Sequence, residues 1–349
     1  MKIVHIESGL GNQMLIYCEY LALKKCNPGE KIYIETSVYD IPECSDTICQ
    51  WNGYELKRVF GIDAPNIREI MTDEQWRDFL EDVRQSRFWE KNWNYPRYIT
   101  AALKKQGFEV ENIRGDFEAE GAKLMTREST SFKSRMGHTL PGYWLKKFLR
   151  ERKKAAVLQE KNDQEKLFLS TDSSVFTGQR LSFKFVGNGI ERIRQEIGES
   201  FVFPEITDEK NLEMLSLIRS TNSVAIHARR GDMLGYNADF YKYGYFKRAV
   251  KYIRSKVSEP VFIFFCEPGG GEWCRENGKI FGLDPKKDTV YFTDWNKGTE
   301  SFRDMQLMAE CRHQIITNSS FGWWAAYLNR NPEKITCAPD FTINTTNYF

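Results

Sequence analysis

Residues 223–233 read SVAIHARRGDM, an apolar run that ends in two adjacent arginines and a glycine. The part SVAIHA predicts a buried strand. Arginine keeps its charge on burial, so either an internal carboxylate or an anionic ligand must meet Arg229 and Arg230. Side chains alternate along a strand. We therefore expect one arginine to face a ligand and the other to pair with Asp232; an internal Arg–Asp salt bridge without a ligand is the alternative.

Strands and helices alternate on both sides of this stretch, which is typical of parallel sheets. Downstream, the sequence predicts strands at 261–266, 313–318 and 334–339, with helices over 239–257, 301–311 and 321–329. Upstream, a strand at 2–6, a glycine loop, a helix over 13–25 and a strand at 31–36 form a similar unit. The pattern predicts an α/β protein with two Rossmann-like parallel-sheet domains facing a cleft. The expected bounds are 1–205 for the first domain, with an inserted segment of about 65–200, and 206–349 for the second.

The composition is that of a globular protein, with 41% apolar and 28% charged residues in a chain of 349. Fifty Lys and Arg against 48 Asp and Glu exclude nucleic-acid binding driven by overall charge. Eight cysteines without a CxxC pair, and only four histidines, argue against a zinc cluster and fit a reduced, cytoplasmic compartment. The N-terminal residues do not read as a signal peptide, and no apolar run approaches the ~20 residues of a membrane span.

The run KKFLRERKK at 146–154 carries six Lys and Arg against one Glu. Two interpretations stay open for it: a solvated helical face, or a peripheral contact with the anionic inner surface of a membrane.

The loop SGLGNQ at 8–13 joins a predicted strand to a predicted helix, where backbone N–H groups and the helix dipole favour an anion. The dinucleotide pattern G-x-G-x-x-G fails, because Met14 stands where the third glycine would be. A tight turn with no ligand is the structural alternative. Otherwise Gly11, Asn12 and Gln13 are candidates for binding the phosphate oxygens or sugar hydroxyls of a ligand. Should the chemistry need a base, Glu7, just before the loop, is a candidate, followed by His5 and Asp232; a structural role in the strand is the alternative for His5.

The stretch ITNSSFGWW at 316–324 places Asn318, Ser319 and Ser320 between a predicted strand and a predicted helix. These residues suit plain helix capping, and they also suit a phosphate or ribose site. Asp304, in SFRDMQLM, has an apolar helical face around it and is a candidate acceptor for the edge of a guanine base.

No D-x-D triplet occurs in the chain. Clustered carboxylates commonly hold a divalent cation on a pyrophosphate. Without them, arginine and helix N-termini are expected to stabilise a leaving pyrophosphate, and we expect neither a metal nor a cofactor.

Taken together, SGLGNQM, SVAIHARRGDM and DMQLMAECRHQIITNSSFGWWAAYLN resemble the α-1,2-fucosyltransferase family of the bacterial type. The resemblance implies a GT-B fold and an inverting, metal-independent transfer of L-fucose from GDP-fucose to a galactose-type hydroxyl of a glycan. It also implies roles for the matching residues. One of Arg229 and Arg230 would hold the β-phosphate, and His227 and Asp304 would hold the guanine side. Ser319 and Ser320, followed by Phe321, would contact phosphate or ribose, and Asn12 would reach donor and acceptor.

Two departures from the family pattern concern the site. Met233 replaces the usual tyrosine after HARRGD, and FFCEPGGGEW replaces an FSDD-type segment. Three alternatives stay open: a fucosyltransferase of another linkage or acceptor, transfer of another nucleotide-bound sugar, and a non-catalytic carbohydrate-binding protein.

Overall fold

The computed structural model describes residues 1–47, 52–90, 95–113, 132–137, 139–149, 151–178, 188–230, 240–284 and 286–339. Contacts divide the chain into two compact units. The first comprises residues 1–125 and 154–204, and the second comprises 126–153 and 205–349.

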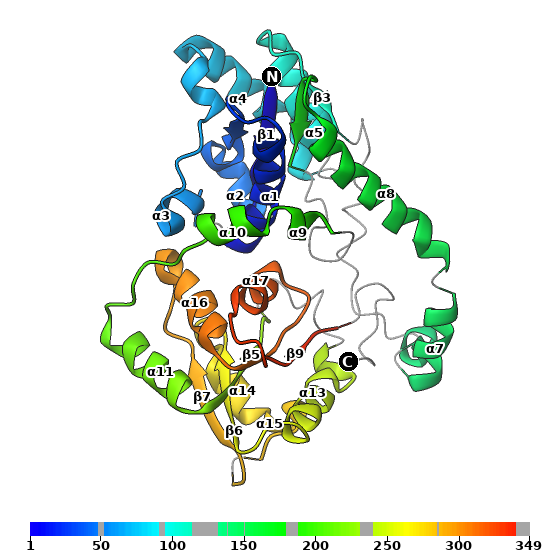
Figure 1. Ribbon diagram of the computed structural model, residues 1–349, viewed down its shortest axis with the longest axis vertical. Helices are drawn as coiled ribbons and strands as arrows, with labels where there is room; N and C mark the ends of the chain where they lie inside the picture. Colours follow the sequence, from blue (N-terminus) through cyan, green and yellow to red (C-terminus); the bar gives the residue numbers. More distant parts are fainter. Residues whose placement is uncertain are drawn as a thin grey trace. The chain divides into compact units, whose positions relative to one another are not determined.

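The first unit contains a parallel four-stranded sheet in the order β2-β1-β4-β3, of which Figure 1 labels β1 and β3. Its strands are β1 (Lys2–His5), β2 (Tyr33–Glu35), β3 (Glu111–Asn112) and β4 (Val175–Thr177). Helix α1 (Leu10–Cys26) follows β1 directly, as the glycine loop predicts. Strands β3 and β4 come from the segment 65–200, so this segment supplies half of the sheet's strands.

Two further helices of the first unit are long, α4 (Asp73–Ser86) and α5 (Tyr95–Lys105). The short ones are α2 (Pro42–Thr47), α3 (Leu56–Phe60), α9 (Gly189–Arg192) and α10 (Arg194–Ser200). The sequence TDEQ starts α4 because the side chains of Thr72 and Gln75 form a reciprocal capping box. Phe79 and Val83 of this helix then pack beside Ile3 and Phe176 in one apolar core. Helix α8 (Glu151–Leu169) begins in the second unit and ends in the first.

The second unit contains a parallel five-stranded sheet in the order β7-β6-β5-β8-β9. Its strands are β5 (Asn222–His227), β6 (Pro260–Phe265), β7 (Thr289–Thr293), β8 (His313–Ile315) and β9 (Thr336–Cys337). Strand β5 lies in the centre. The chain builds the sheet outward on one side through β6 and β7, and then on the other side through β8 and β9.

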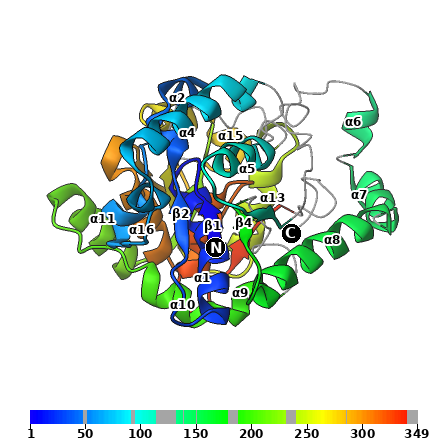
Figure 2. The ribbon, with the colours of Figure 1, turned by 90° about the horizontal axis from the view of Figure 1, so that it is seen from above.

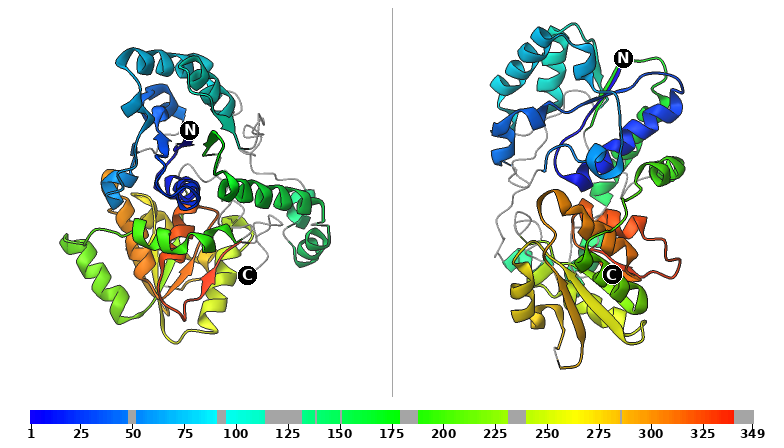
Figure 3. Two further views of the ribbon diagram at one scale, coloured as in Figure 1. Left: turned by 45° about the horizontal axis from the view of Figure 1, so that its top comes forward. Right: turned by 90° about the vertical axis from the view of Figure 1, so that its left-hand side faces the viewer.

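Two groups of helices cover the two faces of this sheet (Figure 3). Val224 and Ile226 of β5 pack with α13 (Tyr245–Arg254), α14 (Gly270–Glu276) and α15 (Gly278–Phe281). The other face carries α11 (Glu209–Ser220), α16 (Phe302–Glu310) and α17 (Ser320–Leu328). There the Ser223 hydroxyl of β5 donates to the Ile218 carbonyl of α11 at 2.9 Å.

The two parallel sheets confirm the predicted α/β class and its two Rossmann-like parts. Several bounds differ from the sequence-based expectation. Strand β8 ends at Ile315 rather than residue 318, and α17 starts one residue early, at Ser320. Strand β7 was not predicted. The seven described cysteines are free thiols, and none of the described helices combines the length and the apolarity needed to cross a bilayer.

Candidate functional site

The second sheet reverses its strand order between β5 and β8, which are hydrogen-bonded neighbours. In open α/β sheets, ligands bind at the carboxyl ends of the strands where the order reverses. His227, Arg229 and Arg230 lie at the carboxyl end of β5, and Asn318–Phe321 follow β8. The sheet topology therefore brings two of the predicted motifs to the same edge.

The two arginines continue the alternation of β5. Ala228 belongs to the core with α13, and the guanidinium of Arg230, on the same side, lies 3.4 Å from the centre of the Trp273 ring of α14. The Arg230 backbone N–H donates to Glu267 Oε2 at 3.3 Å. From the same alternation we infer that Arg229 lies on the opposite side, with His227, whose pKa its charge lowers. Asp232 lies outside the described residues, and its pairing with an arginine stays a prediction.

His227 is a buried, neutral imidazole. Burial, and then the charge of Arg229, lower its pKa to about 3. Its ring centre lies 5.7 Å from that of Phe321, and a Cβ atom on Gly322 would come within 2.6 Å of its Nδ1. Within the described part of the chain, buried Nδ1 has no hydrogen-bond partner. Buried polar atoms are rarely left unpaired, so this atom is suited to a ligand.

The N-terminus of α17 also offers polar groups at this edge. Ser319 is the N-cap residue, but its side chain makes no capping hydrogen bond, contrary to the plain capping interpretation. Asn318, Ser319 and Ser320 are half-buried. Just before them, the buried Thr317 Oγ1 has no partner among the described residues. The first N–H groups of a helix attract anions, and here two hydroxyls stand beside them.

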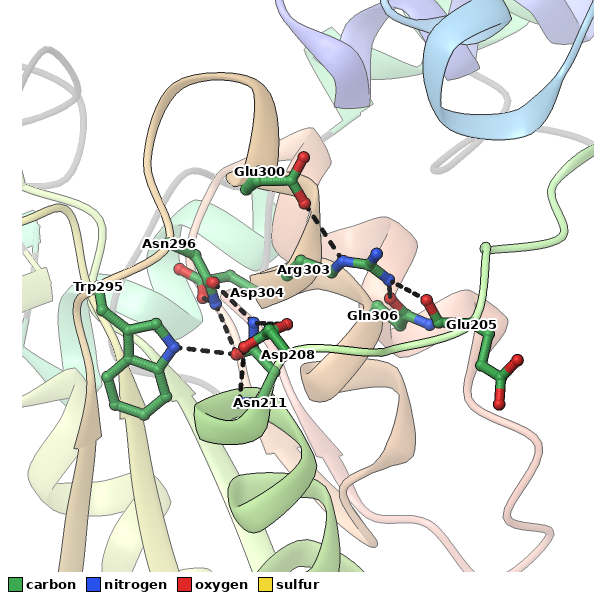
Figure 4. A network of polar contacts seen from close by, with 9 residues as sticks. All are labelled: Glu205, Asp208, Asn211, Trp295, Asn296, Glu300, Arg303, Asp304 and Gln306. Atoms are coloured by element: carbon green, nitrogen blue, oxygen red, sulfur yellow. Dashed lines mark hydrogen bonds and ion pairs between the residues drawn. The ribbon is translucent and has the colours of Figure 1, made fainter.

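Asp304 lies in the first turn of α16 and belongs to a buried polar network, shown in Figure 4. Its Oδ1 accepts a hydrogen bond from Asn296 Nδ2 at 2.7 Å. Asn296 and Asn211 exchange two hydrogen bonds of 2.9 and 3.1 Å, and Trp295 Nε1 donates to Asn211 Oδ1 at 3.0 Å. Asp208, which caps α11, accepts from Asn211 Nδ2 at 2.9 Å.

Burial raises the pKa of Asp304 to about 8, although the hydrogen bond from Asn296 lowers it; the charge of Asp294 adds to the rise. The second oxygen of Asp304, Oδ2, has no hydrogen-bond partner in the described ranges. The network therefore fixes one carboxyl oxygen and leaves the other for a donor from outside. The sequence analysis did not predict a role for Asn211, Trp295 or Asn296. The sequence marks their positions only as polar stretches, one at 207–211 and a short one after TVYFT.

The glycine loop of the first unit is held by its own side chains. Gln13 Nε2 donates to the carbonyls of Ser8 and Gly53, and Gln13 Oε1 accepts from the N–H of Glu55. The Leu10 N–H, at the start of α1, donates to Glu55 Oε2 at 3.1 Å. Gln13 therefore supports the loop from within the unit.

The other predicted residues of this loop are differently placed. Gly11 is buried in the first turn of α1, while Asn12 beside it is half-buried. Glu7 has no exposed surface, and His5 forms a buried ion pair with Glu35. Asn12 is therefore the candidate in the loop whose side chain is most open to a ligand.

Residues 192–345, which include this edge of the second sheet, match glycosyl transferase family 11. The match covers the second unit from shortly before α11 to beyond β9, and the first unit lies almost entirely outside it.

Two curated relatives of the family 11 region carry names that include the linkage they form. The chain is 31% identical to the galactoside alpha-(1,2)-fucosyltransferase 1 of Saimiri sciureus over 148 residues. The alignment covers 39% of this chain and 38% of that protein. It is 36% identical to an alpha-1,2-colitosyltransferase of Escherichia coli over 134 residues. That alignment covers 36% of this chain and 43% of the relative. The chain thus spans about two fifths of the length of the curated relatives it matches.

Among solved structures, a mutant of Arabidopsis thaliana FUT1 in complex with GDP is similar with a TM-score of 0.45 and 8% identity. The alignment covers 98% of this chain and 71% of that one.

Proposed function

We propose that the protein transfers L-fucose from GDP-fucose to a galactose-type hydroxyl group of a glycan, with inversion, to form an α-1,2 linkage. The observation that carries the proposal is the group of residues at the switch point of the second sheet. There, the neutral His227 ends β5 with Arg229 just after it, and the N-terminus of α17 follows β8. This edge lies in the family 11 region, whose relatives are named for α-1,2 transfer.

In this reaction the bond between C1 of fucose and the β-phosphate oxygen breaks, and its electron pair leaves with the diphosphate. The acceptor oxygen bonds to C1 from the opposite face and loses its proton to a base. Arg229 and the first N–H groups of α17 stabilise the negative charge that grows on the diphosphate. The proposal assigns no step to a metal ion or cofactor.

Guanine recognition is assigned to Asp304. A guanine N1–H and its exocyclic amino group are two adjacent donors, and a carboxylate accepts from such a pair. Asn296 already occupies Oδ1, which orients the carboxyl plane. His227 Nδ1 and the hydroxyls of Ser319 and Ser320 complete the donor contacts, toward base, ribose or phosphate.

The reaction also needs a base that takes the acceptor proton. Asp232 and Glu7 are its candidates, and the burial of Glu7 within the first unit means that only a rearrangement or a water chain would connect it with an acceptor. A strongly dissociative reaction would make little demand on either carboxylate.

A second candidate donor is GDP-colitose, because the relative with 36% identity is named a colitosyltransferase. Colitose lacks one hydroxyl group of fucose, so the contacts assigned above to guanosine diphosphate would serve both donors. The difference would lie in the residues that meet the sugar ring.

The test is incubation of the full chain with a galactose-terminated oligosaccharide and each of several nucleotide sugars, GDP-fucose and GDP-colitose among them. Parallel samples contain EDTA. We expect GDP release with GDP-fucose, an α-1,2 product by NMR, and the same rate with EDTA. Consumption of GDP-colitose alone would reassign the donor. Loss of activity in EDTA with recovery on adding Mn²⁺ would overturn metal independence, and binding of the glycan without release of any nucleotide would favour a carbohydrate-binding protein.

A further inference from the structure

Helix α7 (Leu140–Phe148) turns its apolar side toward solvent. It buries one large side chain, Tyr143, which is 2% exposed. The large apolar residues that follow one another along its outer side are Leu140 (63% exposed), Trp144 (56%), Leu145 (58%), Phe148 (79%) and Leu149 (50%). Residues four positions apart lie above one another on a helix, so these side chains form one continuous stripe.

The short helix α6 (Phe132–Gly137) lies beside α7 (Figure 2) and adds two exposed apolar residues to the stripe. Phe132 and Met136 of α6 are 78% and 45% exposed. The two helices are in backbone contact, because a Cβ on Gly142 would collide with the carbonyl oxygen of Met136. We call residues 132–149 the α6–α7 hairpin. Single exposed apolar residues are ordinary, but a contiguous group on a packed hairpin marks an interaction surface.

The same stretch is strongly basic. Residues 132–154 contain eight Lys and Arg and one Glu, a formal charge of +7 in a chain whose total is +2. Lys147 Nζ lies 4.9 Å from the ring centre of Trp144 and 5.7 Å from that of Tyr143. Charged groups therefore border the apolar stripe. The long stems of lysines beside such a stripe allow the ammonium groups to reach a polar layer while the apolar side chains go deeper.

We propose that the α6–α7 hairpin docks the protein on the surface of an anionic lipid bilayer. The apolar stripe would enter the boundary between headgroups and acyl chains, and the basic residues would meet the lipid phosphates. The two features together select this partner. A nucleic acid offers no apolar layer for Phe132, Leu140 and Phe148, and a second copy of the hairpin would bring +4 against +4. This surface is independent of the proposed transfer reaction.

The test is flotation of the full chain with vesicles of phosphatidylcholine alone and with vesicles that also contain phosphatidylglycerol. We expect binding to the anionic vesicles that weakens as salt increases, and little binding to the neutral ones. The double variant Trp144→Ser/Phe148→Ser should bind anionic vesicles about tenfold more weakly, or weaker still, because burial of apolar side chains drives insertion. Lys146→Gln with Lys147→Gln should weaken binding to anionic vesicles.

A matched control replaces two exposed apolar residues elsewhere, Val202→Ser with Tyr252→Ser, which are 58% and 43% exposed. This variant should float like the wild-type chain. A second measurement guards against a folding defect: brominated lipid should quench part of the wild-type tryptophan fluorescence, and Trp144→Phe should remove that part. Absence of flotation, equal flotation of the Trp144/Phe148 variant, or apolar-dependent dimerisation without lipid would each overturn the proposal.

Discussion

The guanidinium of Arg230 is stacked on Trp273, 3.4 Å from the ring centre, while Arg229 lies on the opposite face with His227. Neighbours in sequence thus have different surroundings. Arg230 joins the end of β5 to α14, whereas Arg229 acts on His227, whose ring lies beside Phe321 of α17.

Arg229→Ala should lower the turnover of GDP-fucose by about 10²–10³ or more, because it removes a charge that stabilises the leaving diphosphate. Thermal unfolding should change little. Arg230→Ala should also reduce turnover, but with a loss of stability of about 0.5–2 kcal/mol from the lost stacking. A double-mutant cycle with Trp273→Ala isolates the stacking, because Trp273→Ala alone also removes packing against Tyr241 and Phe281. Near-normal rates for Arg229→Ala would refute this division of roles.

Gly322→Ala should disturb the site through His227. The new Cβ would come within 2.6 Å of Nδ1, so either the imidazole or the first turn of α17 must move. We expect a stability cost of about 1–3 kcal/mol, as for other overpacked sites, and weaker GDP binding by calorimetry. The pair His227→Ala with Gly322→Ala relieves the clash and should recover the stability but not the binding. Unchanged GDP affinity in Gly322→Ala would show that His227 is not part of the donor site.

Asp304 should make GDP binding depend on pH. Its pKa of about 8 keeps the free carboxyl neutral at lower pH, whereas guanine donors require the carboxylate. Affinity should therefore rise as the pH rises toward 8, and Asp304→Asn should abolish the rise. Calorimetric titration across this range, with both proteins in the same buffers, provides the measurement.

Stability should change with pH in the opposite direction. Between the unfolded value of 3.8 and the folded value of about 8, the unfolded state is ionised and the folded state is not. The contribution of Asp304 therefore falls as the pH rises through this window. Denaturant titrations of wild type and Asp304→Asn should diverge accordingly, and parallel curves would place the folded pKa near its ordinary value.

Asn211 should act as a positioning residue. It contacts Asn296, Trp295 and Asp208 but not Asp304, whose orientation it controls through Asn296. Asn211→Ala should raise the KM for GDP-fucose with a smaller effect on kcat, and it should weaken the pH dependence assigned to Asp304. Gln306→Ala, on the same helix as Asp304 and bonded to Arg303, is the control and should change neither. An equal fall of kcat and kcat/KM would point to a different role.

Glu7→Gln should decide whether a carboxylate before the glycine loop takes the acceptor proton. If it does, kcat falls by about 10²–10⁴ and the acidic limb of the pH–rate profile is lost. An unchanged profile would remove Glu7 and leave Asp232, which the matched variant Asp232→Asn then tests.

The strands of the second sheet and the divergence of the arginines were predictable, because both depend on local periodicity. Apolar runs of five or six residues mark β5 and β6, and alternation decides which side Arg229 takes. The alternating TVYFT of β7 carried a signal that was missed. What local patterns do not contain is the pairing of polar side chains distant in sequence: Asn211 meets Asn296 85 residues away, and Gln13 meets Glu55 42 residues away. Ser319 looks like a capping residue by type, and the structure leaves its hydroxyl out of the cap.

Because side chains alternate along β5, the site depends on the number of residues between His227 and Arg229 more than on the size of the side chain at Ala228. Natural variants could change Ala228 within the space of the core, and the spacing of two between His227 and Arg229 would still direct both toward α17. A deletion of one residue between them would place Arg230 on the side of His227 and take it away from Trp273. Insertions and deletions should therefore be far rarer than substitutions in this stretch among proteins that share the activity.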